Sequence, residues 1–365
     1  MYFKNEIKNC FIIAEAGVNH NGDLDMAKKL CRSAKEIGAD AIKFQTWITE
    51  DIIFSGVEQA EYQKTESAHS DQFEMLKQLE LSFDDFRILQ NYCNELGILF
   101  LSTPNDIKSA RFLHSLNLPF FKTGSDDLDN YPLLKEIAQY DKPMLISTGM
   151  STMNEIQETA NFLKFNSNLS FLHCTSSYPT KISNCNLNAI ISMKEKLDTT
   201  IGYSDHTETT WMSPLAVYLG AQIIEKHLTL DNYLPGPDHK SSLLPEQFEK
   251  MVLLINNISE LKQKQEKIDN SKICKLLEIN LDMMNSALGS FEKKPTKEEF
   301  SIMPFVKKSI VTTSDVMKNE SFSRTNLSVK RTGGLGLSPR NFFDIINRPA
   351  KINIKKNEVL LLEAF

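Results

Sequence analysis

The sequence predicts an α/β fold, a (β/α)8 barrel, followed by a small and mostly β C-terminal module. Eight short runs rich in β-branched residues alternate with amphipathic stretches at helical spacing, which is the pattern of βα units that build a parallel sheet. Eight such units in series favour a closed barrel. The alternative, a doubly wound open sheet, is disfavoured because no glycine-rich dinucleotide-binding turn follows the first run.

The predicted strands and helices have recognisable boundaries. The helical stretch after the first strand stops at Gly38, and the stretch before the third strand starts at Ser82 or Asp84 as a cap. Thr152 and Glu155 have the spacing of a capping box. A long helix over residues 245–263 follows the eighth strand and would close the barrel. The eight strands are predicted to begin at Cys10, Ala39, Gly97, Pro119, Lys142, Leu169, Thr199 and Ala221.

The chain divides into three predicted parts. Residues 1–285 form the barrel, and residues 286–305 form a polar, Lys/Glu-rich linker that contains Pro295 and Pro304. Residues 306–365 form the C-terminal module, with strand-like pieces in "SIVTTSD", "NLSVKR", "AKINI" and "VLLLEAF".

Composition excludes several classes of protein. The formal net charge of the 365 residues is -6, so no basic excess is present to neutralise nucleic acid phosphates. No apolar run is long enough for a signal-peptide core or a membrane span. The six cysteines contain no C-x-x-C spacing, and we expect reduced, mostly buried thiols in a cytoplasmic protein.

Polar residues gather at the carboxyl ends of the predicted strands, where (β/α)8 barrels carry their reacting groups. Residues two apart share a face of a strand, so Glu225 and His227 should face the barrel mouth, whereas Lys226 should point towards the helices or solvent. The residues at these ends are Glu15, Lys43, Gln45, Lys122, Ser125, Ser147, Ser176, Tyr178, Ser204, His206, Glu225 and His227.

Two histidines stand at matching ends of the seventh and eighth strands. Neighbouring strands lie about 4.8 Å apart, so His206 and His227 could both reach one metal ion. A single histidine of this kind is more often a hydrogen-bonded core or surface residue, but the pair favours a site for a divalent ion acting as a Lewis acid.

Two lysines and several hydroxyls indicate an anion site. Lys43 and Lys122, with the serines at the strand ends, suit a small and multiply charged anion such as a phosphorylated carboxylate. Each lysine alone is typical of an exposed strand end, and a Schiff-base lysine is a rival interpretation. Glu15 is the candidate acid/base group, although a lone carboxylate is as often a structural partner of a lysine.

These residues lie in motifs that resemble those of the sialic acid synthase family. The similar segments are "FIIAEAGVNHNGDLDMAKKL", "GADAIKFQT", "FLSTPND", "ISTGMST", "LHCTSSYPT", "IGYSDHT" and "IEKHLTLD", followed by "GPDH", in order from Phe11 to His239. The stretch "KSIVTTSDVMKNESFSRTNLSVKR" is similar to the antifreeze-like (SAF) domain that ends these enzymes. Members of the family condense phosphoenolpyruvate with an N-acetylated mannosamine-type sugar.

The resemblance implies a role for each residue. It implies His206 and His227 as ligands of a divalent metal, usually Mn²⁺ with Mg²⁺ or Co²⁺ as alternatives, and Glu15 as the proton-transferring group. It implies a homodimer in which the SAF domain is exchanged and Arg331 reaches the partner's sugar site. The implied phosphoenolpyruvate site is Lys43, Lys122, Ser125, Ser147, Ser176 and Ser204, and the implied sugar site is Gln45, Tyr178, Glu225, Asp238 and Arg331.

Three positions depart from the family pattern. "KTGSDDL" stands where "KIGSGEL" is usual, which changes the surroundings of Asp126 and Asp127. Ser176 stands where asparagine is common, and the proline that usually follows the arginine is missing after Arg331. The altered loop touches the sugar in the family, so the identity of the sugar is left open.

The sequence leaves several functions in competition. Legionaminate and pseudaminate synthases use 2,4-diacetamido-6-deoxy sugars and share most of these motifs; the stretch from Tyr62 to Ser82 is more similar to sialate and legionaminate enzymes. A class I aldolase that uses Lys43 or Lys122 as a Schiff base is a second interpretation. A non-catalytic sugar-binding protein is a third.

Overall fold

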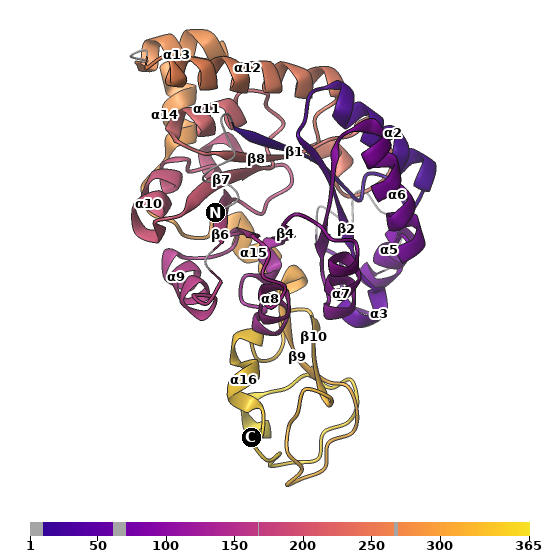
Figure 1. The fold of residues 1–365 in the computed structure, drawn as a ribbon. Coiled ribbons are helices and arrows are strands. Elements are labelled where there is room, and N and C mark those ends of the chain that lie inside the picture. Colours follow the sequence, from indigo (N-terminus) through magenta and orange to yellow (C-terminus); the bar gives the residue numbers. More distant parts are fainter. Residues whose placement is uncertain (1–9, 61–70, 167, 266–268) are drawn as a thin grey trace.

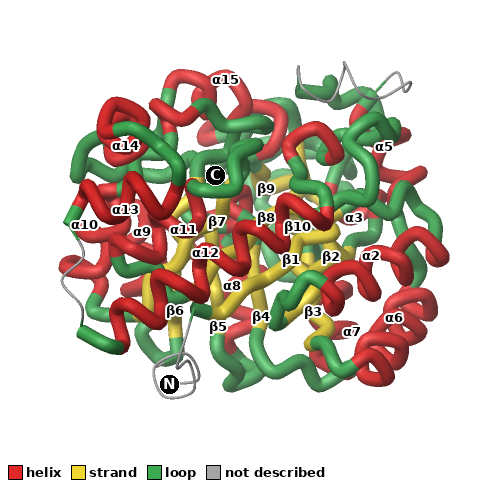
Figure 2. Tube along the Cα trace, turned by 90° about the horizontal axis from the view of Figure 1, so that it is seen from above, coloured by secondary structure: helices red, strands yellow, loops and turns green. Residues whose placement is uncertain are grey.

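Eight parallel strands form the barrel that the sequence predicts (Figure 2). The computed structural model describes residues 10–60, 71–166, 168–265 and 269–365. Hydrogen bonds connect the strands in the order β3-β2-β1-β8-β7-β6-β5-β4, so β1 and β8 pair and the ladder is interrupted between β3 and β4. The strands are β1 (Phe11–Gly17), β2 (Ala41–Thr46), β3 (Leu99–Pro104), β4 (Phe121–Thr123), β5 (Met144–Ser147), β6 (Leu169–Cys174), β7 (Thr200–Asp205) and β8 (Ile223–His227).

Helices surround the strands, and their ends follow the predicted signals. Ser82 and Thr152 each form a capping box, and α2 ends before Gly38, which adopts a φ of +80°. The helices of the barrel are α2 (Leu24–Glu36), α3 (Thr49–Ile52), α5 (Gln72–Leu79), α6 (Phe83–Leu96), α7 (Ile107–Ser115), α8 (Tyr131–Ala138), α9 (Met153–Phe162), α10 (Asn188–Leu197), α11 (Met212–Leu219) and α12 (Pro245–Gln263). The predicted helix over 245–263 is confirmed.

The inside of the barrel is filled by one apolar layer. Inward-facing residues of seven strand regions form it: Ile13, Ala41, Leu101, Phe120, Leu145, Leu172 and Ile223. Gly202 of β7 completes the layer without a side chain, because a Cβ there would overlap Leu172 and Ile223. The next inward position of each strand lies two residues further on, where the apolar layer gives way to polar side chains.

The segment after α12 leads back to the mouth of the barrel. It contains α13 (Asn270–Leu277), α14 (Leu281–Leu288) and α15 (Lys297–Val306). Helix α14 spans the boundary predicted at residue 285, and α15 occupies much of the predicted linker. The division into domains stays a prediction.

The C-terminal module has its own small hydrophobic core, which includes Ile310, Phe322 and Ile345. Strands β9 (Lys308–Thr312) and β10 (Leu327–Arg331) pair antiparallel, and a short helix, α16 (Phe342–Ile345), follows. The strands expected in "AKINI" and "VLLLEAF" were predicted wrongly. Each segment forms only an isolated bridge: Ile354 pairs with Val316, which lies outside the strands, and Val359 pairs with Val311 of β9.

The module packs against the side of the barrel that carries α7, α8 and α15, opposite α12 (Figure 1). A buried ion pair joins the two parts: Lys308 Nζ lies 2.7 and 2.8 Å from the carboxylate oxygens of Asp127. Lys308 also donates to the carbonyl of Asn105 at 2.9 Å. Removal of one partner of such a buried ion pair typically lowers the free energy of unfolding by about 3–5 kcal/mol. The contact therefore fixes the position of the module on the barrel.

Two further expectations can be compared with the structure. None of the six cysteines forms a disulfide, and all except the half-buried Cys10 are buried. Every helix among the described residues is too short or too polar to cross a lipid bilayer. Residues 61–70, which belong to the stretch compared with sialate and legionaminate enzymes, lie outside the described residues.

Candidate active site

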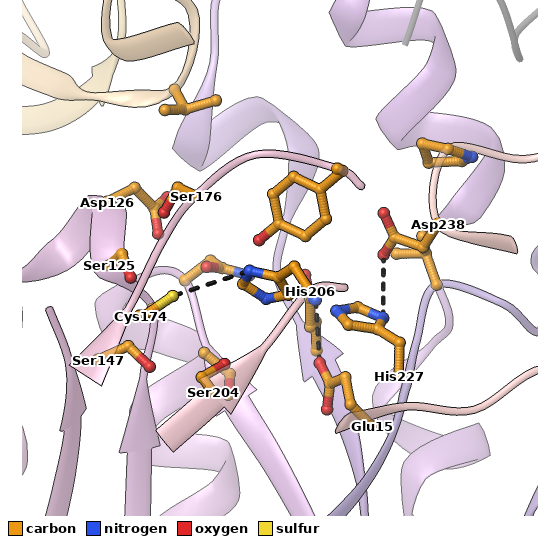
Figure 3. Close-up of a pocket in the computed structure, with 18 of the residues that line it drawn as sticks. Glu15, Ser125, Asp126, Ser147, Cys174, Ser176, Ser204, His206, His227 and Asp238 are labelled. Atoms are coloured by element: carbon orange, nitrogen blue, oxygen red, sulfur yellow. Dashed lines mark hydrogen bonds and ion pairs between the residues drawn. The ribbon is translucent and has the colours of Figure 1, made fainter. Parts of the chain in front are cut away.

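One pocket at the barrel mouth contains every residue for which a catalytic, binding or metal-ligating role is predicted (Figure 3). The pocket is lined by Glu15, Lys43, Gln45, Lys122, Ser125, Ser147, Ser176, Tyr178, Ser204, His206, Glu225, His227, Asp238 and Arg331. Several of these lie two residues beyond the apolar layer, as Glu15 follows Ile13 and Lys43 follows Ala41. Their side chains therefore form the polar layer above the core, while their roles stay predictions.

Two lysines and two carboxylates form a buried ionic network at the base of this pocket. Lys43 Nζ lies 2.7 Å from Glu15 Oε2 and 3.6 Å from Glu225 Oε2. Lys122 Nζ lies 3.2 Å from Glu225 Oε1. All four side chains are at least nine-tenths buried, so each charge needs its partners to offset the loss of hydration.

The network separates the proton affinities of its two carboxylates. Burial raises the pKa of Glu15 to about 7, and Lys43 only partly offsets that effect. Burial also disfavours the charged form of Glu225, but the nearby Lys122 and Lys43 hold its pKa below the usual value. Glu15 can therefore exchange a proton near neutral pH, whereas Glu225 stays ionised.

Glu225 lies closer to the lysines than the family resemblance suggested. The resemblance places it in the sugar and water region, yet its carboxylate bridges Lys43 and Lys122 and accepts a hydrogen bond from Ser204 at 3.0 Å. Its position indicates that it aligns the two cations, which are the candidates for anion binding.

The serines converge because a glycine leaves room for them. The amide of Gly149 donates to Ser125 Oγ at 2.9 Å, and a Cβ on residue 149 would overlap the hydroxyls of Ser125 and Ser176. Ser147 Oγ is buried without a hydrogen-bond partner among the described residues. A buried hydroxyl of this kind is ready to bind a ligand oxygen.

The two histidines meet on the other side of the pocket. The rings of His206 and His227 lie 5.5 Å apart between centroids. His206 Nδ1 lies 2.8 Å from the carbonyl of Thr175, which can only accept, so Nδ1 carries the hydrogen and Nε2 is the nitrogen that can bind a ligand. His227 Nδ1 is buried with no hydrogen-bond partner among the described residues.

This donor set fits a metal ion that takes its other ligands from substrate and water. Burial lowers the pKa of His227 well below its usual value, which favours the neutral form that binds metals. Burial opposes the charge on His206 too, but Cys174 raises the pKa of that imidazole to about 9, so a metal must displace its proton. No group of three or more His, Cys, Asp and Glu side chains in the described ranges is arranged to hold a metal.

Two of the residues expected to contact the sugar, Tyr178 and Asp238, lie beside these histidines. The ring of Tyr178 lies 4.2 Å from that of His206, and Asp238 Oδ2 lies 3.8 Å from His227 Nδ1. Gln45 donates to Glu15 Oε1 at 3.1 Å. Burial raises the pKa of Asp238 to about 6, and His206 partly opposes the shift.

Arg331 comes from β10 of the C-terminal module and lines the pocket of its own chain. Its guanidinium donates to Asp126 Oδ2 at 3.1 Å and to Gln72 Oε1 at 3.3 Å. The single chain thus supplies an arginine that the resemblance assigns to a partner subunit. The exchange of domains between subunits stays a prediction.

Helix α15 contributes a part of the site that the sequence did not reveal. Glu299 is almost completely buried, and its Oε1 accepts from the backbone amides of Met150 at 2.7 Å and Ser176 at 2.9 Å. Ile302 and Val306 of the same helix line the pocket. The capping-box spacing from Thr296 to Glu299 could have indicated the helix, but not the loops that it joins.

Comparison with known proteins gives a consistent assignment. The model of the NeuB family matches residues 30–267. The chain is 39% identical to N,N'-diacetyllegionaminic acid synthase of Legionella pneumophila over 97% of this chain and 94% of that protein. It is 34% identical to N-acetylneuraminate-9-phosphate synthase of Homo sapiens, over 97% of this chain and 92% of that protein. The crystal structure of spore coat polysaccharide biosynthesis protein SpsE of Bacillus subtilis superposes with a TM-score of 0.80 at 33% identity, and covers 98% of this chain and 95% of that one.

Removal of the Glu299 carboxylate should loosen the loops that follow β5 and β6. In a Glu299→Ala variant the amides of Met150 and Ser176 lose their acceptor, and each such loss costs about 1–3 kcal/mol. We expect hydrogen exchange at these two amides to become roughly tenfold to a hundredfold faster, measured by NMR. The matched control is Glu298→Ala, which removes a neighbouring carboxylate that pairs with the exposed Lys181 and does not bond to these two amides. Equal protection of both amides in the two variants would contradict the assignment.

Proposed function

The chain belongs to the NeuB family, and from this membership we propose that it is a nonulosonic acid synthase. The proposed reaction condenses phosphoenolpyruvate with an acetamido sugar and water, and it gives a nine-carbon 2-keto acid and phosphate. One observation carries the proposal: the barrel mouth presents two buried lysines, balanced by two carboxylates, beside converging serine hydroxyls. That set suits an anion with several negative oxygens.

N-acetylmannosamine and 2,4-diacetamido-6-deoxy sugars are both candidate acceptors. The relatives are described as a legionaminic acid synthase, a pseudaminic acid synthase and N-acetylneuraminate-9-phosphate synthases. The products named for these relatives are all nonulosonic acids, but each is made from a different sugar. The family therefore supports the condensation more strongly than it supports any one acceptor.

We assign binding of phosphoenolpyruvate to the ionic network and the serines. Lys43 and Lys122 would hold the anion, and Ser125, Ser147, Ser176 and Ser204 would surround its oxygens. The hydroxyl of Ser204 donates to Glu225 in this structure, so Ser204 would have to change partner to donate to the anion. Positioning of the two reactants in one pocket lowers the entropic cost of their encounter. Burial lowers the pKa of Lys122, and the carboxylate of Glu225, which lies beside both lysines, opposes that loss of charge.

The proposed chemistry uses Glu15 for proton transfer. Carbon 3 of phosphoenolpyruvate attacks the aldehyde carbon of the open-chain sugar, which forms the new C–C bond while carbon 2 becomes cationic. Water adds to carbon 2 and loses a proton to Glu15. The tetrahedral intermediate then expels phosphate by cleavage of the C–O bond, which leaves the 2-keto group. The carbonyl π bond of the aldehyde breaks as the C–C bond forms, and its oxygen needs a proton to become a hydroxyl. A pKa of about 7 suits Glu15 to accept the proton from water and to supply one to this oxygen.

We propose His206 and His227 as the protein ligands of a divalent ion, with Mn²⁺ first and Mg²⁺ or Co²⁺ as alternatives. When bound, such an ion would supply Lewis-acid polarisation of the sugar carbonyl. Tyr178 and Asp238 lie against the two imidazoles and would orient the sugar there. Gln45, hydrogen-bonded to Glu15, would help to position the attacking water.

The direct test is phosphate release from phosphoenolpyruvate in the presence of Mn²⁺, with N-acetylmannosamine and 2,4-diacetamido-2,4,6-trideoxymannose as parallel acceptors. We expect sugar-dependent release, and the better acceptor identifies the sugar. His227→Ala should reduce turnover by at least about a hundredfold because one metal ligand is lost, whereas His114→Ala, on an exposed helix face, should leave it unchanged. A folded, metal-loaded protein that releases no phosphate with either sugar would refute the proposal.

We also propose a homodimer with exchanged C-terminal modules. In a domain-exchanged dimer, the contacts between module and barrel are the same as in the single chain, but they join two subunits. Arg331 would then contact the barrel of the partner subunit with the geometry that this structure shows within one chain. Mixing Glu15→Gln and Arg331→Ala proteins, each inactive alone, would then restore about a quarter of normal turnover, because half of the dimers contain one intact site. Absence of restoration after subunit exchange would show that each chain completes its own site.

A further inference from the structure

A second buried ion pair lies behind the two histidines, on the outer side of strands β7 and β8. Asp205 directly precedes His206 at the end of β7. Lys226 directly precedes His227 at the end of β8. Successive side chains alternate in direction along a strand, so Asp205 and Lys226 point away from the barrel mouth. Lys226 Nζ lies 3.0 Å from Asp205 Oδ2, and both side chains are completely buried. Neither lines the pocket, and the proposed reaction gives neither a role.

This ion pair holds the chain on both sides of His206. Asp205 Oδ1 accepts a hydrogen bond from the amide of Thr207 at 2.9 Å, and Asp205 Oδ2 accepts one from Ser213 Oγ at 2.7 Å. Lys226 Nζ donates to the carbonyl of Thr207 and lies 3.3 Å from its hydroxyl oxygen. His206 therefore stands between two residues that are both bound to the same buried ion pair.

The ion pair also lies where the backbone pairing of β7 with β8 ends. Asp205 and Lys226 are the last register partners of this ladder, and each histidine comes one residue later. Past this point His227 is paired with β1, and the imidazole of His206 bonds to the carbonyl of Thr175 after β6. The ion pair thus ties the two strand ends together directly behind the two imidazoles.

A metal site with two protein ligands depends on how firmly those two ligands are held. The remaining ligands would come from substrate and water, so the protein has to fix the separation of His206 and His227. Groups in such a site need to be held to within about 0.5 Å of their working positions by the residues that surround them. Residues that fix the strand ends are therefore expected to affect metal affinity.

We infer that Lys226 and Asp205 are positioning residues for the proposed metal site: from outside the pocket, their ion pair sets the separation and direction of the imidazoles of His206 and His227. The inference rests on the metal ligands assigned in the proposed function. It extends that site to two residues that touch neither metal nor substrate. Apolar side chains of similar size often stabilise a buried position at least as well as an ion pair, so stability alone does not account for these charges.

The first test measures binding of Mn²⁺ to the full-length protein through the EPR signal of free Mn²⁺, without turnover. In Lys226→Met and Asp205→Asn the Kd of Mn²⁺ should rise by about tenfold to a hundredfold, which is the usual effect of losing a residue that orients a metal ligand. In turnover, the Mn²⁺ concentration that gives the half-maximal rate should rise by a similar factor. The KM of phosphoenolpyruvate should change by less than about twofold. An unchanged Kd of Mn²⁺ in the folded variants would overturn the inference.

A double variant separates positioning from stability. Each single change leaves one buried charge without its partner, which lowers the Tm. Lys226→Met combined with Asp205→Leu leaves neither charge, so its Tm should lie closer to that of the wild type than the Tm of either single variant. Its Kd for Mn²⁺ should nevertheless stay raised. If the double variant binds Mn²⁺ as tightly as the wild type, the ion pair does not position the histidines and the inference is wrong.

Lys308→Met is the matched control. The ion pair of Lys308 with Asp127 is as deeply buried, but it joins the C-terminal module to the barrel, and neither residue lines the pocket. We expect this variant to lose stability and to keep a Kd for Mn²⁺ within about twofold of the wild-type value, because the two ion pairs share no partner. An equal weakening of Mn²⁺ binding in Lys308→Met would assign the effect to general destabilisation and contradict the inference.

The outcomes distinguish the inference from the proposed reaction. A wild-type protein that binds Mn²⁺ and releases phosphate, with the same Kd for Mn²⁺ in the Lys226 and Asp205 variants, overturns the inference alone. Mn²⁺ binding that depends on Lys226, without phosphate release with either sugar, supports the inference and refutes the proposed reaction. A wild-type protein that binds no Mn²⁺ overturns both the metal assignment and the inference.

Discussion

The ionic network of Lys43, Lys122, Glu15 and Glu225 is the constraint around which the barrel mouth is organised. Four charges with little exposure to water are tolerable only while they offset one another, and each is held by a separate strand end. An anion that binds the lysines must compete with the carboxylates, which changes the electrostatic surroundings of Glu15. Substrate binding and the proton affinity of the acid/base group are therefore linked by the same contacts.

The barrel and the residues at its mouth could be predicted because they follow from strand periodicity. An inward apolar residue such as Ile13 or Ala41 is followed two positions later by Glu15 or Lys43, and parallel strands bring all these positions to one end. The same parity placed Lys226 outside the mouth. The sequence could not say that Lys226 would be completely buried, with an ion pair of 3.0 Å to Asp205.

The spacing of apolar residues along the sequence could not predict contacts between distant segments. The spacing from Thr296 to Glu299 is local, but the loops that Glu299 joins lie more than a hundred residues earlier in the chain. The pairing of Asp126 with Arg331 likewise depends on how the C-terminal module docks, which the buried Lys308–Asp127 pair fixes. The strand-like patterns of "AKINI" and "VLLLEAF" led to a wrong prediction, because the β-propensity of a segment does not guarantee that it pairs along its length with another strand.

In the proposed reaction, the barrel mouth holds phosphoenolpyruvate while its C–O bond is cleaved. The most direct test is to supply phosphoenolpyruvate labelled with ¹⁸O at the bridging oxygen, together with the better acetamido sugar, and to follow the label by ³¹P NMR and mass spectrometry. We expect the label to leave in the phosphate, because water supplies the new keto oxygen. Retention of the label in the keto acid would mean that the P–O bond is cleaved instead and would refute the proposed reaction.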